Sequence, residues 1–169
     1  MFYAEIKANS NDETGRQITI SDGSTQNKVE IKYTATDNRI DSDIKSGNVQ
    51  QASFNHTLST VLEYHKIAVK YKANDFAFYI DGQEISTDNS GLTPVGMNTL
   101  NFDAGNGSNA FLGNCKMIAV FKEALTDLEL KKLTGYNNHE LYMNYYNRLS
   151  YLGLVEEYNV ESDINNYIL

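Results

Sequence analysis

Apolar and polar residues alternate along most of the first 121 positions, and this period of two constrains the fold more than any other feature. In the most regular stretch, residues 66–87, Ile67 and Val69 share one side of a run while Ala68 and Lys70 share the other. The same alternation recurs in the runs 2–7, 18–20, 29–33 and 76–80. It is typical of strands with one dry and one wet side. Because each dry side must be covered, the sequence predicts an all-β, antiparallel two-sheet sandwich.

Turn-forming residues separate these runs. Gly, Asn, Asp and Ser fill the segments 9–15, 21–27 and 41–48, which are therefore predicted to be loops. Asp81-Gly82 predicts a tight turn, since glycine adopts positive φ at little cost. This turn would join the last two strands of a three-stranded meander over 66–87.

The pattern changes after residue 121. Thr126 and Glu129 have the spacing of a capping box, in which each side chain accepts from the other residue's N–H, and Gly135 supplies a stop. A leucine and tyrosine stripe predicts a second helix over 138–152. We therefore divide the chain into a sandwich, residues 1–135, and a helical extension, residues 136–169, that packs on the sandwich or on a neighbouring chain.

The composition excludes several classes of partner. The chain has 169 residues and a formal net charge of -8, which argues against nucleic acid and against anionic lipid. No apolar run is long enough to be inserted in a membrane. Cys115 is the single cysteine, so an internal disulfide is impossible, and its place before an apolar run predicts a small core residue.

Three further motifs carry a family resemblance. They are an aromatic-apolar-Asp-Gly strand end at 79–82, Gly113 before the strand 116–121, and the run ALTDLEL at 124–130. In these the chain resembles the concanavalin A-like, laminin-G-type jelly roll, in the version found in bacteriophage tail-fibre and tail-tip proteins and related bacterial surface proteins. The resemblance implies a jelly roll and a place on a virion or cell surface. It also implies other tail proteins as partners and a homo-oligomer, commonly a trimer.

Enzymes on this jelly roll have signatures that the sequence lacks. The glucanase type places two carboxylates on one strand through the spacing Glu-x-Asp-x-x-Glu, which does not occur here. His56, His65 and His139 have no metal-ligand spacing. We therefore expect a protein that is not an enzyme, with a glycan-active hydrolase or lyase as an alternative.

A sugar site is one candidate on the sheet surface. Sugars stack on aromatic rings, and the chain has 12 tyrosines and no tryptophan. Tyr79 is expected on the wet side of its strand near Lys70, and Tyr3 lies on a similar strand side. These residues are candidate glycan ligands; an ordinary cross-strand pair on a wet sheet is the other interpretation.

A polar loop offers a candidate calcium site. Asp103, Asn106 and Asn109 crowd oxygen-bearing side chains around glycines. Calcium prefers such ligands, and laminin-G-like domains often carry it. The other interpretation is a polar turn selected for positive φ.

These features lead to one functional hypothesis and two alternatives. The sequence is interpreted as a non-catalytic carbohydrate-binding or receptor-recognition module, placed on a phage tail fibre or another virion surface protein, that binds a surface glycan. A structural domain for virion decoration or assembly is the first alternative. The hydrolase or lyase is the second.

Overall fold

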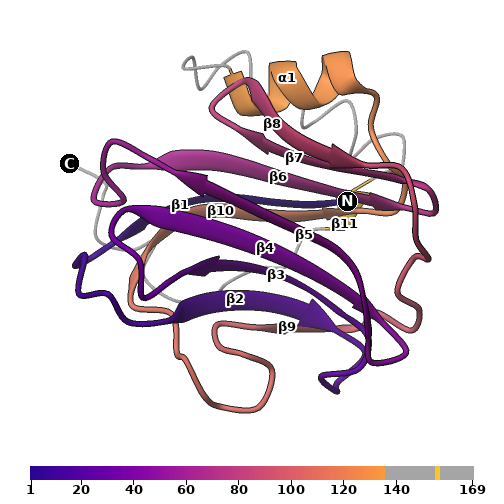
Figure 1. The fold of residues 1–169 in the computed structure, drawn as a ribbon, viewed down its shortest axis with the longest axis horizontal. Helices are drawn as coiled ribbons and strands as arrows, with labels where there is room; N and C mark the ends of the chain where they lie inside the picture. The colour runs from indigo at the N-terminus through magenta and orange to yellow at the C-terminus, as the bar shows by residue number, and fades with distance from the viewer. Residues whose placement is uncertain (136–154, 157–169) are drawn as a thin grey trace.

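The computed structural model describes residues 1–135 and 155–156, which form two antiparallel sheets packed face to face (Figure 1). Sheet A has the strand order β11-β10-β1-β6-β7-β8 and sheet B the order β5-β4-β3-β2-β9. In these orders, the strands of sheet A are Val155–Glu156, Gly113–Phe121, Phe2–Ala8, His65–Lys72, Asp75–Ile80 and Gln83–Asp88. Those of sheet B are Val49–Thr57, Arg39–Ser46, Lys28–Tyr33, Arg16–Ser21 and Thr99–Asn101. The predicted two-sheet jelly roll is confirmed.

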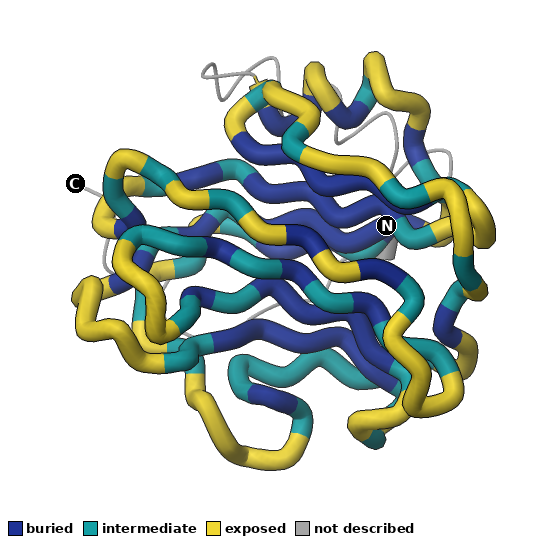
Figure 2. Tube along the Cα trace, in the orientation of Figure 1, coloured by how far each residue is buried: buried dark blue, intermediate teal, exposed yellow. Residues whose placement is uncertain are grey.

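The apolar sides of the two sheets face each other and form the main core, seen as the buried inner strands in Figure 2. Ile67, Val69 and Phe76 are fully buried in it, as the alternation predicts. Phe54 of sheet B stacks on Phe78 of sheet A, with ring centroids 5.9 Å apart and planes 8° from parallel. Aromatic pairs of this kind add to the area that each ring buries, and this one joins the two layers directly.

The meander of β6, β7 and β8 forms as predicted. Ile80 of β7 pairs with Gln83 of β8, which leaves a two-residue turn between them. Both turn residues, Asp81 and Gly82, have positive φ, 49° and 81°. Two positive values are what the favoured two-residue hairpin turn requires, so the Asp-Gly signal is confirmed.

The loop predicted over 41–48 is wrong. Residues 39–46 form β4, which is paired on one side with β3 and on the other with β5. Ile40, Ser42 and Ile44 are fully buried on the inner side of β4. Aspartate is a poor strand former, but the charged residues point outward while partners on both sides satisfy the backbone. Only residues 47 and 48 turn, and both have positive φ.

The helix α1, Asp127–Gly135, covers the outer side of sheet A beside β7 and β8 (Figure 1). Its capping box is present: Thr126 N donates to Glu129 Oε2 at 2.8 Å, and Glu129 N donates to Thr126 Oγ1 at 3.4 Å. Leu130 and Leu133 are fully buried in a second apolar cluster on this side of the sheet. Sheet A is therefore covered on its outer side as well where α1 contacts β6, β7 and β8.

The second predicted helix, 138–152, lies outside the described residues, and the domain boundary at 135 stays a prediction. Beyond it, Val155 and Glu156 form β11, which pairs with Phe121 and Val120 of β10. In the part of the chain that the structure describes, no helix has the length and apolar character needed to cross a membrane.

The His65 side chain connects the loop before β6 to the turn after β7 through two hydrogen bonds. Its Nδ1 lies 2.6 Å from Asp81 Oδ2 and its Nε2 lies 2.8 Å from the Thr60 carbonyl oxygen. Both partners are acceptors, so only the imidazolium donates to both. Burial alone would lower the His65 pKa, but the hydrogen bonds to Asp81 and Thr60 outweigh it and raise the pKa above 6.5.

This raised pKa predicts a pH-dependent stability. The stabilisation from His65 is fully present below about pH 6.5, the pKa of the unfolded chain, and is lost as pH rises through the higher folded-state pKa. The Asp81 pKa is lowered, so its carboxylate stays ionised over this window. Urea unfolding at a series of pH values should show that the free energy of unfolding falls as the pH rises above about 6.5. In the His65→Gln variant this fall should disappear; an identical fall there would refute the assignment.

Candidate functional site

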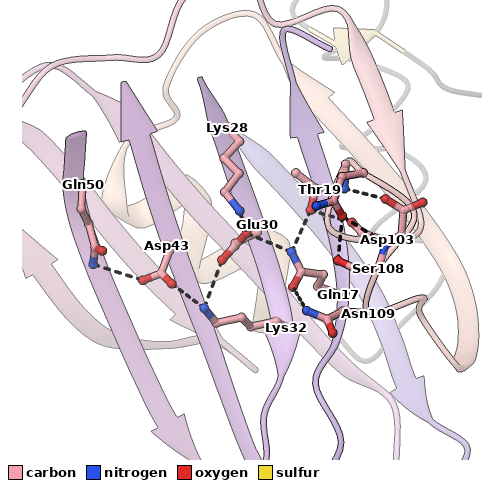
Figure 3. Close-up of polar contacts among 12 residues, drawn as sticks. Gln17, Thr19, Lys28, Glu30, Lys32, Asp43, Gln50, Asp103, Ser108 and Asn109 are labelled. Carbon is pink, nitrogen blue, oxygen red and sulfur yellow. Dashed lines mark hydrogen bonds and ion pairs between the residues drawn. The ribbon is translucent and has the colours of Figure 1, made fainter. Parts of the chain in front are cut away.

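The outer side of sheet B carries a network of polar side chains that we call the polar face. Its central residues alternate with core residues on three neighbouring strands, so the fold presents them together (Figure 3). They are Gln17 and Thr19 of β2, Lys28, Glu30 and Lys32 of β3, and Asp43 of β4. Most are deeply buried although they lie on an outer surface: Glu30 is 4% and Gln17 5% exposed.

Glu30 is the centre of the network. It forms ion pairs with Lys28 through Oε2 and with Lys32 through Oε1, the latter at 3.0 Å. Gln17 Nε2 donates to Glu30 Oε2 at 2.9 Å. Hydrogen bonds to charged groups are stronger than neutral ones, so the four side chains hold one another in place before any ligand arrives.

Asp43 extends the network toward the edge strand β5. It forms an ion pair with Lys32, accepts from Ser53 Oγ at 2.6 Å and accepts from Gln50 Nε2 at 3.3 Å. Burial alone would raise the Asp43 pKa, but the hydrogen bonds from Lys32 and Ser53 outweigh it and hold the pKa below its usual value. Gln50 and Ser53 are exposed, so this end of the network is open to a ligand.

A loop after β9 stands beside the other end of the polar face (Figure 3). Thr19 Oγ1 donates to the Asp103 carbonyl oxygen at 2.8 Å. Gln17 N donates to the Asn109 carbonyl oxygen at 3.1 Å, and Asn109 Nδ2 donates to Gln17 Oε1 at 3.4 Å. The loop is thus tied to β2 at both of its ends, and Gln17 joins it to the charged centre.

The loop contains the three residues predicted to bind calcium. Asp103 Oδ1 accepts from Gly105 N at 2.5 Å, and Asn106 Oδ1 accepts from Ser108 N at 3.1 Å. Asn109 has positive φ. These contacts are typical of a polar turn, and among the described residues no group of three or more His, Cys, Asp or Glu is placed to hold a metal ion. Calcium binding by this loop stays a prediction.

The three predicted glycan ligands do not face solvent. Tyr79 is 3%, Tyr3 0% and Lys70 5% exposed. Both tyrosines belong to the apolar cluster to which α1 contributes, and Lys70 Nζ is held by Asp75 at 2.6 Å and Asp127 at 2.8 Å. The expectation of a wet sheet face here is wrong, because an apolar cluster that includes Leu130 and Leu133 of α1 forms on this side of the sheet. The structure therefore does not make these rings available for stacking on a sugar.

Sequence reasoning did not single out the polar face, although a signal was present. The runs RQITIS and KVEIKY place only polar residues on the outer sides of β2 and β3. Such a run predicts a wet strand side, but it does not show that several strands gather one network. That information comes from the register, in which Glu30 lies directly opposite Asp43.

A cleft at one end of the sandwich has a different character. Its volume is about 730 Å³, and its lining includes Ile20, Tyr71, Met97, Val120 and Phe121. Ile20 and Phe121 are buried members of the two apolar clusters. The cleft therefore borders both apolar clusters, and its lining also carries hydrogen-bonding side chains such as Lys72, Asn98 and Glu123.

The chemistry of the polar face favours binding over proton transfer. Glycoside hydrolysis needs a carboxyl group that stays protonated to act as the acid. Here Lys32 pairs with both Glu30 and Asp43, and the pKa of Asp43 is lowered. Cys115 offers no nucleophile either, since burial raises the pKa of its thiol to about 11.

The fold is that of a concanavalin A-like jelly roll. A family profile described as the concanavalin A-like lectin/glucanases superfamily matches residues 2–131, and the chain belongs to this superfamily. No curated protein matches the sequence significantly.

Solved structures with the same fold include sugar-binding domains. The CBM40 domain of the Ruminococcus gnavus IT-sialidase is 14% identical, with a TM-score of 0.62 over 79% of this chain and 81% of that one. The same domain bound to α2,3-sialyllactose gives a TM-score of 0.63. A leech intramolecular trans-sialidase is 16% identical, with a TM-score of 0.63 over 82% of this chain and 23% of its own length. At such identities these likenesses show the fold alone.

Proposed function

We propose that this domain is a non-catalytic carbohydrate-binding module whose ligand lies on the polar face of sheet B. The observation that carries the proposal is a pre-organised set of donors and acceptors on the outer side of sheet B. Glu30 is its buried centre, Lys32 and Asp43 are partly exposed, and Gln50 and Ser53 form its accessible edge. Sugar hydroxyls both donate and accept, so they complement a surface of this kind. A pre-ordered site also loses less side-chain freedom on binding.

The biological setting is the finer part of the proposal. We place the module on a bacteriophage tail fibre, another virion protein or a cell surface, with other tail proteins and further copies of the chain as partners. Support comes from the strand-end motif at 79–82, from Gly113 and from the run 124–130, which resemble tail proteins. Immunogold labelling of virions and of cells with an antibody to this domain tests the placement; label absent from both surfaces would contradict it.

A glycan array tests the binding function. We expect the domain to bind a subset of glycans, and the array is read with calcium and again with EDTA to test the loop at 103–109. Signal on the array without release of reducing ends or unsaturated sugars supports a binding module. An array silent in both conditions would overturn the proposal and favour a decoration domain that binds only protein.

A paired substitution locates the site. The Gln50→Ala, Ser53→Ala double variant removes two exposed polar groups at the edge of the network, and each neutral hydrogen bond that such a group makes to a sugar hydroxyl contributes about 1 kcal/mol. We expect binding about tenfold weaker by calorimetry, with unchanged unfolding. The matched control is Gln83→Ala, Ser86→Ala, the same exposed residue types on the edge strand of sheet A. Equal affinity of the two double variants would place the ligand elsewhere.

A further inference from the structure

We propose that the polar face selects a neutral oligosaccharide and rejects glycans that carry a carboxylate or sulfate on the recognised sugar, with Glu30 as the residue that sets this choice. The inference rests on the proposed function, because it names the ligand class of the same site.

The first argument is that the central cations are already paired. Lys28 pairs with Glu30, and Lys32 pairs with both Glu30 and Asp43. The side chains of Lys28 and Glu30 are only 10% and 5% exposed, so water screens this pair weakly. An anionic sugar would have to compete with two built-in carboxylates for the same ammonium groups.

The basic side chain of Arg39, at the start of β4, is also held by a carboxylate. Arg39 holds Asp41 with two parallel contacts, Nε to Oδ1 at 2.6 Å and Nη2 to Oδ2 at 3.1 Å. In such a bidentate pair, the guanidinium N–H groups that would otherwise bind the carboxylate of a ligand are already engaged. Lys45 is the one basic residue of β3 and β4 without an ion pair among the described residues, and it lies at the end of its strand, opposite Lys28.

The second argument is the balance of charge and of hydrogen-bonding type. Lys28 and Lys32 are offset by Glu30 and Asp43, and the whole chain carries a net charge of -8. A carboxylate or sulfate offers only acceptors, whereas this face presents acceptors and donors side by side. Neutral hydroxyls satisfy both kinds of group, so they fit the network without displacing Glu30 or Asp43.

Glu30 is buried beneath the lysines that it pairs with, so it would influence a ligand through them. Lys28, Lys32 and Gln17 bond to it and leave it 4% exposed, while the Lys32 side chain stays 23% exposed. A ligand would therefore touch Lys32 and Asp43, and Glu30 would determine how much positive charge they present. Removing that one carboxylate should convert the face from neutral to cationic.

The test is an array of matched pairs, each neutral oligosaccharide printed beside counterparts that carry sialic acid, uronic acid or sulfate on the same core. The wild-type domain should bind the neutral glycan of each pair and bind its acidic counterpart about tenfold more weakly. Its affinity for the neutral glycans should change little when salt is added. Strongest signal on acidic members would overturn this inference and leave the proposed function standing. Silence on every glycan would overturn the proposed function itself.

Glu30→Gln is the decisive variant. It keeps the shape of the side chain, leaves Lys28 uncompensated, and should raise affinity for acidic members about tenfold over wild type. Glu63→Gln, at an exposed loop acid, changes the net charge equally and should not alter the preference. An unchanged preference in a folded Glu30→Gln variant would overturn the role of Glu30. Should that variant unfold, the salt response of the wild type still decides whether the ligand is neutral.

Discussion

Replacing Gly113 by alanine is expected to destabilise the domain by about 3 kcal/mol, at the upper end of the usual cost of overpacking. Gly113 is the first residue of β10 and pairs with Ala8 of β1. An added Cβ would overlap the carbonyl oxygen of Lys7 and lie 2.6 Å from Phe111 Cζ. The oxygen belongs to the paired strand and cannot move without disturbing the sheet. The Phe111 ring stands beside Tyr33, with centroids 6.0 Å apart, so it too has little room.

The control for this prediction is Gly47→Ala. Gly47 lies in the turn between β4 and β5 with φ of 59°, and a Cβ there would meet nothing within 4 Å. Its cost should be about 1 kcal/mol, the penalty for a left-handed backbone alone. Urea unfolding of both variants separates the two causes. Equal losses would show that β1 and β10 do not approach as closely as described.

Side-chain alternation was sufficient to predict the sandwich, because a period of two determines which residues share a side. It failed at 41–48, where aspartate, serine and glycine are typical of loops in isolation. In the fold, Ile40 and Ile44 of β4 enter the core while Asp41 and Asp43 point outward. Strand pairing on both sides outweighs the low strand propensity of aspartate.

The site was harder to predict, because alternation assigns a side to each residue but not what covers that side. Tyr79 lies opposite the core side of β7, as the pattern indicates, yet α1, which begins 48 positions later in the chain at Asp127, packs on it and buries it. Conversely, Glu30 and Asp43 are 13 positions apart and meet only through the register of β3 and β4. Both facts are consequences of tertiary packing.

Replacing Tyr79 by alanine is accordingly expected to destabilise the domain by about 3 kcal/mol, rather than to affect a sugar site. The ring is 3% exposed and packs with Leu130 and Leu133 of α1, so its removal leaves a cavity between helix and sheet. Its hydroxyl donates to Glu84 Oε2 at 2.5 Å. Burial, together with this hydrogen bond, raises the pKa of Tyr79 above its usual 10.

Tyr79→Phe separates the ring from the hydroxyl. It keeps the packing and loses one hydrogen bond, and because Glu84 is exposed its carboxylate can turn to water, so the cost should be about 1 kcal/mol. Urea unfolding measures both variants, and the glycan array measures binding by the Phe variant, which should equal that of the wild type. A stable Tyr79→Ala variant that lost glycan binding would return the site to sheet A. Stability lost in Tyr79→Ala, with binding unchanged in Tyr79→Phe, would support a role for Tyr79 in packing α1 on sheet A rather than in hydrogen bonding to a sugar.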